Sequence, residues 1–225
     1  MWRERNRSMI LSYLGLRRLI GILGILLPLI CIAGGYLFSG IGIQPSVSAY
    51  YHTNIRDFFV GLMVCTAFFL ATYKGYERID TLASISAGVS GFGLAIFPCL
   101  EGEDIQTPVG ILQLPAGSTG TLHLVFSILF FIILALISLF LFRLSDKKKE
   151  ERSRGKIRRN RVYLVCGLVM LVSLFLLLMV FLWVPPHITA RYKLILIGET
   201  IMLLSFGTSW LTKGKALHLS GKRRS

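Results

Sequence analysis

Residues 122–142 read LHLVFSILFFIILALISLFLF, and no Asp, Glu, Lys or Arg interrupts them. A helix needs about 20 apolar residues to cross the roughly 30 Å hydrocarbon core of a bilayer. The apolar residues follow one another instead of alternating with polar ones, which argues against a half-buried strand. The stretch therefore predicts a transmembrane helix, because a helix satisfies its backbone hydrogen bonds within one segment, as lipid demands.

Five further apolar runs extend this prediction along the chain. Hydrophobic residues make up 54% of the 225 residues and charged residues only 16%, whereas a soluble domain carries about 25% charged residues. We therefore expect an all-α, polytopic membrane bundle of six transmembrane helices. Its spans are predicted over Leu19–Phe38, Phe58–Tyr73, Leu82–Leu100, Leu122–Phe142, Val162–Val184 and Leu194–Leu211.

The sequence also predicts how the chain divides around these spans. A basic segment, residues 1–18, precedes the six-helix domain at 19–212, and a basic tail, residues 213–225, follows it. The fourth and fifth spans are joined by a basic loop over residues 143–161. No separate soluble domain is expected.

The formal net charge of +14 has two possible sources in so apolar a chain: a nucleic-acid-binding surface or basic residues that flank membrane spans. If the N-terminus is cytoplasmic, all but three of the 25 Lys and Arg residues fall in cytoplasmic segments. The exceptions are Arg56, Arg191 and Lys193. The positive-inside rule therefore predicts that both termini are cytoplasmic. In a bacterium, the protein would lie in the inner membrane with its other face toward the periplasm.

The densest basic stretch is KKKEERSRGKIRRNR, residues 147–161. It lies between two spans, without interleaved aromatic residues or a recognisable nucleic-acid-binding module. We therefore expect no nucleic-acid partner. The expected partners of this loop are membrane lipids with anionic headgroups, which attract basic residues near the bilayer surface.

Ionisable groups within or beside spans are the candidates for function, because burying them in a membrane is costly. The direction of each span places five of these groups at the outward-facing end: His52, Asp57, His123, His187 and Glu199. The sequence does not show how close to one another they lie at that end. The outer segment Gln44–Asp57 adds hydroxyl, aromatic and basic groups, among them Ser48, Tyr51 and Arg56.

Three interpretations of these residues compete. In the first, His52, His123 and His187, together with carboxylates, bind a zinc-like ion and activate water for hydrolysis of a lipid-like substrate, with a carboxylate such as Asp57 or Glu199 as the base. No HExxH or HxxxH motif is present. In the second, Glu199 and His123 relay protons or hold a solute during transport. In the third, Glu199 pairs with Arg191 or His123 and pins helices together.

The function that the sequence favours is a binding role and not a particular reaction. We expect an outward-facing polar pocket that binds a lipid or small ligand, or supports a membrane partner. Tyr51 and Arg56 are its predicted ligand-binding residues. Metal-dependent hydrolysis is the alternative, and transport is the second alternative.

Four stretches resemble a group of bacterial six-span membrane proteins without an assigned function. They are SVSAYYHTNIRDFFVG (46–61), YKGYERIDTLASISAGVSGFGLAIFP (73–98), LHLVFSILFF (122–131) and SWLTKG (209–214). A polar Ser-containing loop before the second span and a His that opens the fourth span also look like the damage-regulated autophagy modulator and related Frag-type proteins. This resemblance implies a six-helix membrane fold and no particular reaction.

The chain also resembles, more loosely, the transmembrane hydrolases that include alkaline ceramidases and progestin-and-adipoQ receptors. Those proteins combine a Ser, an Asp and several His residues around zinc at one membrane face. The resemblance implies such roles for Ser48, His52, Asp57 and His123. Those proteins have seven spans and an HxxxH pair, whereas this chain has six predicted spans and no such pair.

Overall fold

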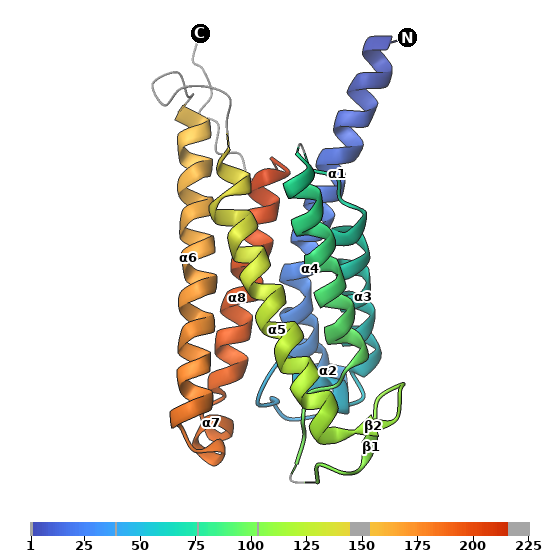
Figure 1. The fold of residues 1–225 in the computed structure, drawn as a ribbon, viewed down its shortest axis with the longest axis vertical. Helices are drawn as coiled ribbons and strands as arrows, with labels where there is room; N and C mark the ends of the chain where they lie inside the picture. The colour runs from blue at the N-terminus through green and yellow to red at the C-terminus, as the bar shows by residue number, and fades with distance from the viewer. Residues whose placement is uncertain (1, 39, 76, 103, 145–153, 216–225) are drawn as a thin grey trace.

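The computed structural model describes residues 2–38, 40–75, 77–102, 104–144 and 154–215, with side chains described from Tyr13 onward. The centre of the basic loop and most of the basic tail, residues 145–153 and 216–225, lie outside the described residues. The predicted lipid contacts of these segments therefore stay predictions. The described chain is predominantly helical (Figure 1).

Long helices cover the predicted apolar runs. The first run lies in α1 (Trp2–Leu29), which continues through a π-helical turn, η1 (Ile30–Gly34), into α2 (Gly35–Phe38). The other long helices are α3 (Arg56–Thr72), α4 (Arg78–Ile96), α5 (Ala116–Leu139), α6 (Arg154–Trp183) and α8 (Leu194–Lys213).

Short elements connect these helices. They are the 3-10 helices η2 (Ser48–His52) and η3 (Leu141–Arg143), the strands β1 (Pro108–Val109) and β2 (Leu114–Pro115), and the helix α7 (Pro186–Arg191). The two strands pair antiparallel, with Pro108 opposite Pro115 and Val109 opposite Leu114.

Local sequence explains where several helices start. The Glu77 side chain accepts from the backbone at Asp80, and the Asp80 carboxylate accepts from the Glu77 N–H at 3.3 Å. This reciprocal capping box satisfies donors that an α-helix leaves free at its N-terminus. Pro186 stands in the first turn of α7, where the missing N–H of proline costs nothing.

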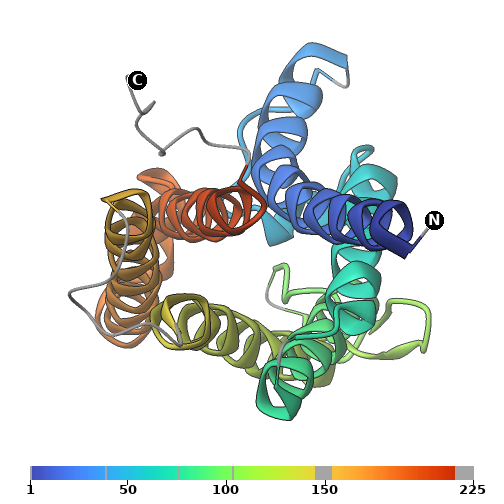
Figure 2. The ribbon, with the colours of Figure 1, turned by 90° about the horizontal axis from the view of Figure 1, so that it is seen from above.

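The six long helices form a closed ring around the bundle axis. Each packs on the next in the order α1, α3, α4, α5, α6, α8, and α8 returns to α1. Figure 2 shows this ring from above. The backbones of α1 and α8 approach each other closely, since a Cβ on Gly207 would lie 2.6 Å from the carbonyl oxygen of Gly21. A larger residue at either position would push the two backbones apart.

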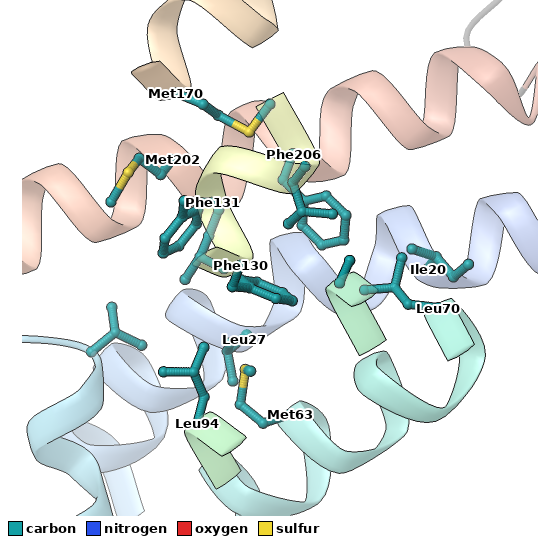
Figure 3. Packing of buried hydrophobic residues seen from close by; sticks show 14 of the residues in the cluster. Ile20, Leu27, Met63, Leu70, Leu94, Phe130, Phe131, Met170, Met202 and Phe206 are labelled. Atoms are coloured by element: carbon teal, nitrogen blue, oxygen red, sulfur yellow. The ribbon is translucent and has the colours of Figure 1, made fainter. Parts of the chain in front are cut away.

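Apolar side chains fill the inside of the ring. Phe130 and Phe131 of α5 lie among Leu27, Met63, Leu94, Met202 and Phe206 from the facing helices (Figure 3). Many other large apolar side chains face outward instead, for example Val172 and Phe175 on α6, which are 55% and 59% exposed. An apolar outer surface is what lipid-facing helices require.

Among the described residues, five helices are long and apolar enough to cross a membrane. They comprise Tyr13–Phe38, Arg78–Ile96, Ala116–Arg143, Arg154–Trp183 and Leu194–Lys213. The predicted all-helical membrane bundle is therefore confirmed at this level. The remaining predicted span corresponds to α3, which has 17 residues and is shorter than the others.

The two ends of the bundle differ in structure. One end, called the hairpin end below, carries η2, the β1–β2 hairpin and α7 (Figure 1). The opposite end, called the terminal end, is where α1 begins, where α3 is followed by α4, and where α8 finishes (Figure 1).

Candidate functional site

An open cleft of about 490 Å³ lies at the hairpin end. One part of its lining comes from η2 and the segment leading into α3, and another part comes from the hairpin and from Glu101 after α4. The lining is mostly polar. It consists of Tyr51, His52, Thr53, Asn54, Arg56, Glu101, Pro108, Val109, Gly110 and Gln113. We call this space the hairpin cleft.

The two residues predicted to bind a ligand meet in this cleft. Arg56 Nη2 donates to the Tyr51 hydroxyl at 2.8 Å, and the guanidinium carbon lies 4.4 Å from the centre of the Tyr51 ring. Tyr51 is buried while Arg56 is exposed. The ring therefore holds the guanidinium in place, and the remaining N–H donors of Arg56 are available to a ligand in the cleft.

His52 is held between two acceptors at the wall of the cleft. Its Nε2 lies 2.8 Å from the carbonyl oxygen of Cys99, and its Nδ1 lies 3.2 Å from Oε2 of Glu101. A neutral imidazole can donate to one of these groups, and the imidazolium form can donate to both. Either way, both ring nitrogens face protein oxygens, so neither lone pair is directed at a metal ion.

The thiol nearest this site is unreactive. Cys99 follows α4, and burial together with the negative charges of Glu199 and Glu101 raises its pKa to about 12. A thiol with so high a pKa stays protonated at neutral pH, and the thiolate is the nucleophilic and metal-binding form. Cys99 therefore contributes structure rather than chemistry.

Glu199 lies deeper, at the junction between α8 and the segment before η2. Its Oε2 accepts from the N–H of Val47 at 2.6 Å and from that of Ser48 at 3.4 Å, and its Oε1 accepts from the Ser48 hydroxyl at 3.2 Å. The Leu196 N–H also donates to the carbonyl oxygen of Pro45 at 3.0 Å. The carboxylate thus caps the start of η2 and ties this segment to α8.

Ser48 and Glu199 therefore do come together, but not around a substrate-sized space. The cavity that both residues line measures about 30 Å³, and apolar side chains such as Phe130 surround it. A space of this size suits about one water molecule rather than a lipid-like substrate. Asp57, the third predicted catalytic residue, is exposed in the first turn of α3 and lines neither space.

The three predicted metal ligands lie in different environments. His123 is buried in α5, where its Nδ1 lies 2.7 Å from the carbonyl oxygen of Phe97. His187 is exposed on α7, across the hairpin end from the strands (Figure 1). Within the described residues, no group of three or more His, Cys, Asp or Glu side chains could hold a metal ion. The residues present do not fit a zinc centre.

A second polar cluster, which sequence reasoning missed, lies at the terminal end. Arg17 is buried at 3% exposure, and its Nε and Nη2 donate to the Tyr73 hydroxyl at 3.0 and 2.8 Å. Its guanidinium carbon also lies 4.3 Å from the centre of the Tyr13 ring. Tyr73 packs edge-on against Trp210, with ring centres 5.1 Å apart.

Lysine and aspartate side chains complete this terminal cluster. Lys213 Nζ lies 4.8 Å from the centre of the Phe142 ring and donates to the Phe142 carbonyl oxygen at 3.3 Å. A small space of about 10 Å³ lies within this cluster. Its lining includes Lys213 and the buried Asp80. The four-residue spacing of Tyr13 and Arg17 is the signal that marks this site, because it stacks a cation on an aromatic ring along one helix face.

Comparison with known proteins adds no family. No family model, curated protein or solved structure matches the chain. The resemblances to six-span bacterial proteins, Frag-type proteins and transmembrane hydrolases therefore stay predictions. Function has to be argued from the geometry of the two ends.

Proposed function

We propose that the chain is a six-span membrane protein of a bacterial inner membrane, with both termini in the cytoplasm and the hairpin end toward the periplasm. The basic residues support this orientation. Among the described residues, every Lys and Arg except Arg56, Arg191 and Lys193 belongs to a segment at the terminal end (Figure 1). An even number of crossings also agrees with α1 starting and α8 finishing at the same end (Figure 1).

α3 is the proposed sixth span. Its 17 residues extend over about 25 Å at about 1.5 Å per residue, a little less than the roughly 30 Å of a typical hydrocarbon core. Arg56 and Asp57 stand at one end of the helix, and Lys74 follows the other. A bilayer accommodates such a short span by local thinning or by snorkelling of the flanking residues.

The proposed function is binding of a small polar ligand or a lipid headgroup in the hairpin cleft. The observation that carries this proposal is an open space of about 490 Å³ in which a fixed guanidinium and an exposed carboxylate line the same cleft. Arg56 offers donors for an anionic group, and Glu101 offers acceptors for a cationic one. Ligand sites characteristically combine such a concave shape with a few convergent polar groups.

The other interpretations have less support. Hydrolysis at a zinc centre would need a group of three ligands, which the described residues do not form, and Ser48 with Glu199 lines a space too small for a lipid. Transport through Glu199 would need this carboxylate to be released from the backbone of Val47 and Ser48. We therefore assign Glu199 a structural role in the proposed function.

Native mass spectrometry of the protein released from gentle detergent tests the proposed function. We expect the wild type to retain a bound small molecule or phospholipid that Arg56→Ala loses. Arg191→Ala is the matched control, since Arg191 also lies over a tyrosine ring, 5.8 Å from that of Tyr192, but does not line the cleft. Equal retention by Arg56→Ala and the wild type, or no retained molecule in any of the three proteins, would refute ligand binding in the cleft.

A further inference from the structure

The β1–β2 hairpin carries two large aliphatic side chains at its apex. Ile111 is 76% exposed and Leu112 is 56% exposed. The chain turns between Gly110 and Gln113, whose φ angles are +72° and +49°. The Gln113 side chain closes the turn by donating to the Gly110 carbonyl oxygen at 2.7 Å. The apex therefore presents apolar surface on a closed turn.

The base of the hairpin fixes where this apex lies. The N–H of Ala116 donates to the carbonyl oxygen of Thr107, and the N–H of Gly117 donates to the carbonyl oxygen of Ile105, both at 3.0 Å. Gly110 also packs so closely on Pro98 that a Cβ would lie 2.9 Å from the proline ring. A larger residue at position 110 would clash with Pro98, and it would also have to adopt a positive φ angle that is unfavourable for residues other than glycine. The hairpin is thus held against the end of α4.

The surroundings of the apex point to a membrane surface. The hairpin projects sideways from the bundle at about the height of α2 (Figure 1). Tyr36 and Phe38 of α2 are 69% and 86% exposed, and Trp183 at the end of α6 is 79% exposed. Tyr and Trp are enriched at the boundary between bilayer and water, so these helix ends mark that boundary. Aliphatic side chains projecting sideways at this height meet lipid rather than bulk water.

The apex and the hairpin cleft are parts of one structure. Gly110 and Gln113, which flank Ile111 and Leu112, both line the cleft. If the apex enters the outer leaflet, one wall of the cleft stands directly at the lipid headgroups. A ligand can then reach the cleft from the bilayer without crossing water.

We propose that Ile111 and Leu112 insert into the outer leaflet and that the hairpin cleft holds the headgroup of a phospholipid carrying both a phosphate and an ammonium group. This inference rests on the proposed function, because it names the class of ligand that the cleft takes. Arg56 recognises the phosphate through its free N–H donors. Glu101 recognises the ammonium group, which distinguishes this class from purely anionic lipids.

The depth of the apex can be measured with a spin label at Leu112→Cys, in vesicles and in a Cys65→Ala background, since Cys65 is an exposed native thiol. We expect the label to collide with dissolved oxygen and to be shielded from a water-soluble nickel chelate. Val172→Cys on the lipid-facing side of α6 is the control for lipid, and Gln106→Cys, an exposed position before β1, is the control for water.

Two results would overturn insertion. A label at position 112 that behaves like the one at position 106 places the apex in water. A label shielded from both reagents places it against another protein. Neither result depends on ligand binding, so the cleft proposal is tested separately.

The ligand class is tested in nanodiscs by comparing phosphatidylethanolamine with phosphatidylglycerol, and by adding water-soluble glycerophosphoethanolamine. We expect phosphatidylethanolamine to be preferred, and Glu101→Gln to lower that preference about tenfold, the effect of one lost charge-assisted contact. Ile111→Ser/Leu112→Ser should weaken binding of the lipid but not of the soluble headgroup.

The outcomes separate the two proposals. If the soluble headgroup binds and the apex variant binds lipid as well as the wild type does, the membrane-inserted hairpin is wrong and the cleft stands. If phosphatidylglycerol is preferred, the assigned ligand class is wrong. If none of the three probes binds, the assigned ligand class is wrong, whereas ligand binding in the cleft as such stands or falls with the native mass spectrometry of Arg56→Ala.

Discussion

The two ends of the bundle use the same residue types with opposite results. At the terminal end, Arg17 is 3% exposed and donates to Tyr73, which packs against Trp210 and lines a space of only about 10 Å³. At the hairpin end, Arg56 is exposed on Tyr51 beside a cleft of about 490 Å³. An arginine on a tyrosine ring is therefore not a functional signature by itself. Whether the space next to it is closed or open decides what it can do.

The largest loss of stability is expected at the terminal end, where the polar cluster is buried. Arg17→Ala removes two hydrogen bonds to the Tyr73 hydroxyl and a cation–π contact inside the protein. We expect it to lower the free energy of unfolding by about 2–4 kcal/mol, because buried polar partners lose their donors. Thermal unfolding in detergent measures this loss.

The matched control is the neighbouring arginine. Arg18 is exposed and donates to the Gly214 carbonyl oxygen at 2.9 Å, so Arg18→Ala should cost less than about 1 kcal/mol. A closed structural cluster at the terminal end is contradicted if Arg17→Ala unfolds no more easily than Arg18→Ala.

A smaller effect is expected for Glu199, the half-buried carboxylate at the hairpin end. Glu199→Gln keeps one acceptor oxygen but puts an amide NH2 in place of the other, which cannot accept from Val47 or Ser48, so we expect a loss of about 1–2 kcal/mol. Ser48→Ala removes only the hydroxyl contact at 3.2 Å and should cost less. Both are measured by thermal unfolding. Unchanged stability of Glu199→Gln would show that this carboxylate is not the tether described above.

The smallest effect on stability tests the open end. Arg56→Ala removes an exposed guanidinium, and exposed charged contacts contribute about 1 kcal/mol or less. We expect nearly unchanged thermal unfolding together with loss of the molecule retained in native mass spectrometry. If Arg56→Ala instead unfolds as readily as Arg17→Ala, the contrast between the two ends disappears.

Much of the fold could be predicted from the sequence, because a lipid-exposed helix needs a long uncharged run. Only a few stretches of this chain are long and uncharged, so the positions of the helices follow from them. The direction of successive spans also predicted that His52, Glu199 and His187 lie at one end, as they do in the structure (Figure 1). The direction in which each span crosses the membrane determines only how deep its residues lie, and not which residues are neighbours. The ring order of the helices decides lateral position, and it separates His187 on α7 from His52 beside the hairpin.

Details of the site depended on contacts that no local pattern encodes. Glu199 caps η2 because residues 45–48 dock on α8, a contact between segments about 150 residues apart. Arg17 looked like a topology charge at the start of a span, and only its burial against Tyr73 and Tyr13 gives it a structural role. The pairing of Tyr51 with Arg56 was easier to anticipate, since both lie in one short polar segment.

The proposed outward-facing cleft depends most directly on the orientation of the bundle. Labelling with a membrane-impermeant maleimide, in bacterial spheroplasts and a Cys65→Ala background, tests it at two positions. Gln106→Cys lies beside the hairpin, and Lys215→Cys follows α8 at the terminal end. We predict that Gln106→Cys is labelled in intact spheroplasts and that Lys215→Cys is labelled only after permeabilisation. The reverse pattern would place the cleft in the cytoplasm and contradict the proposed function.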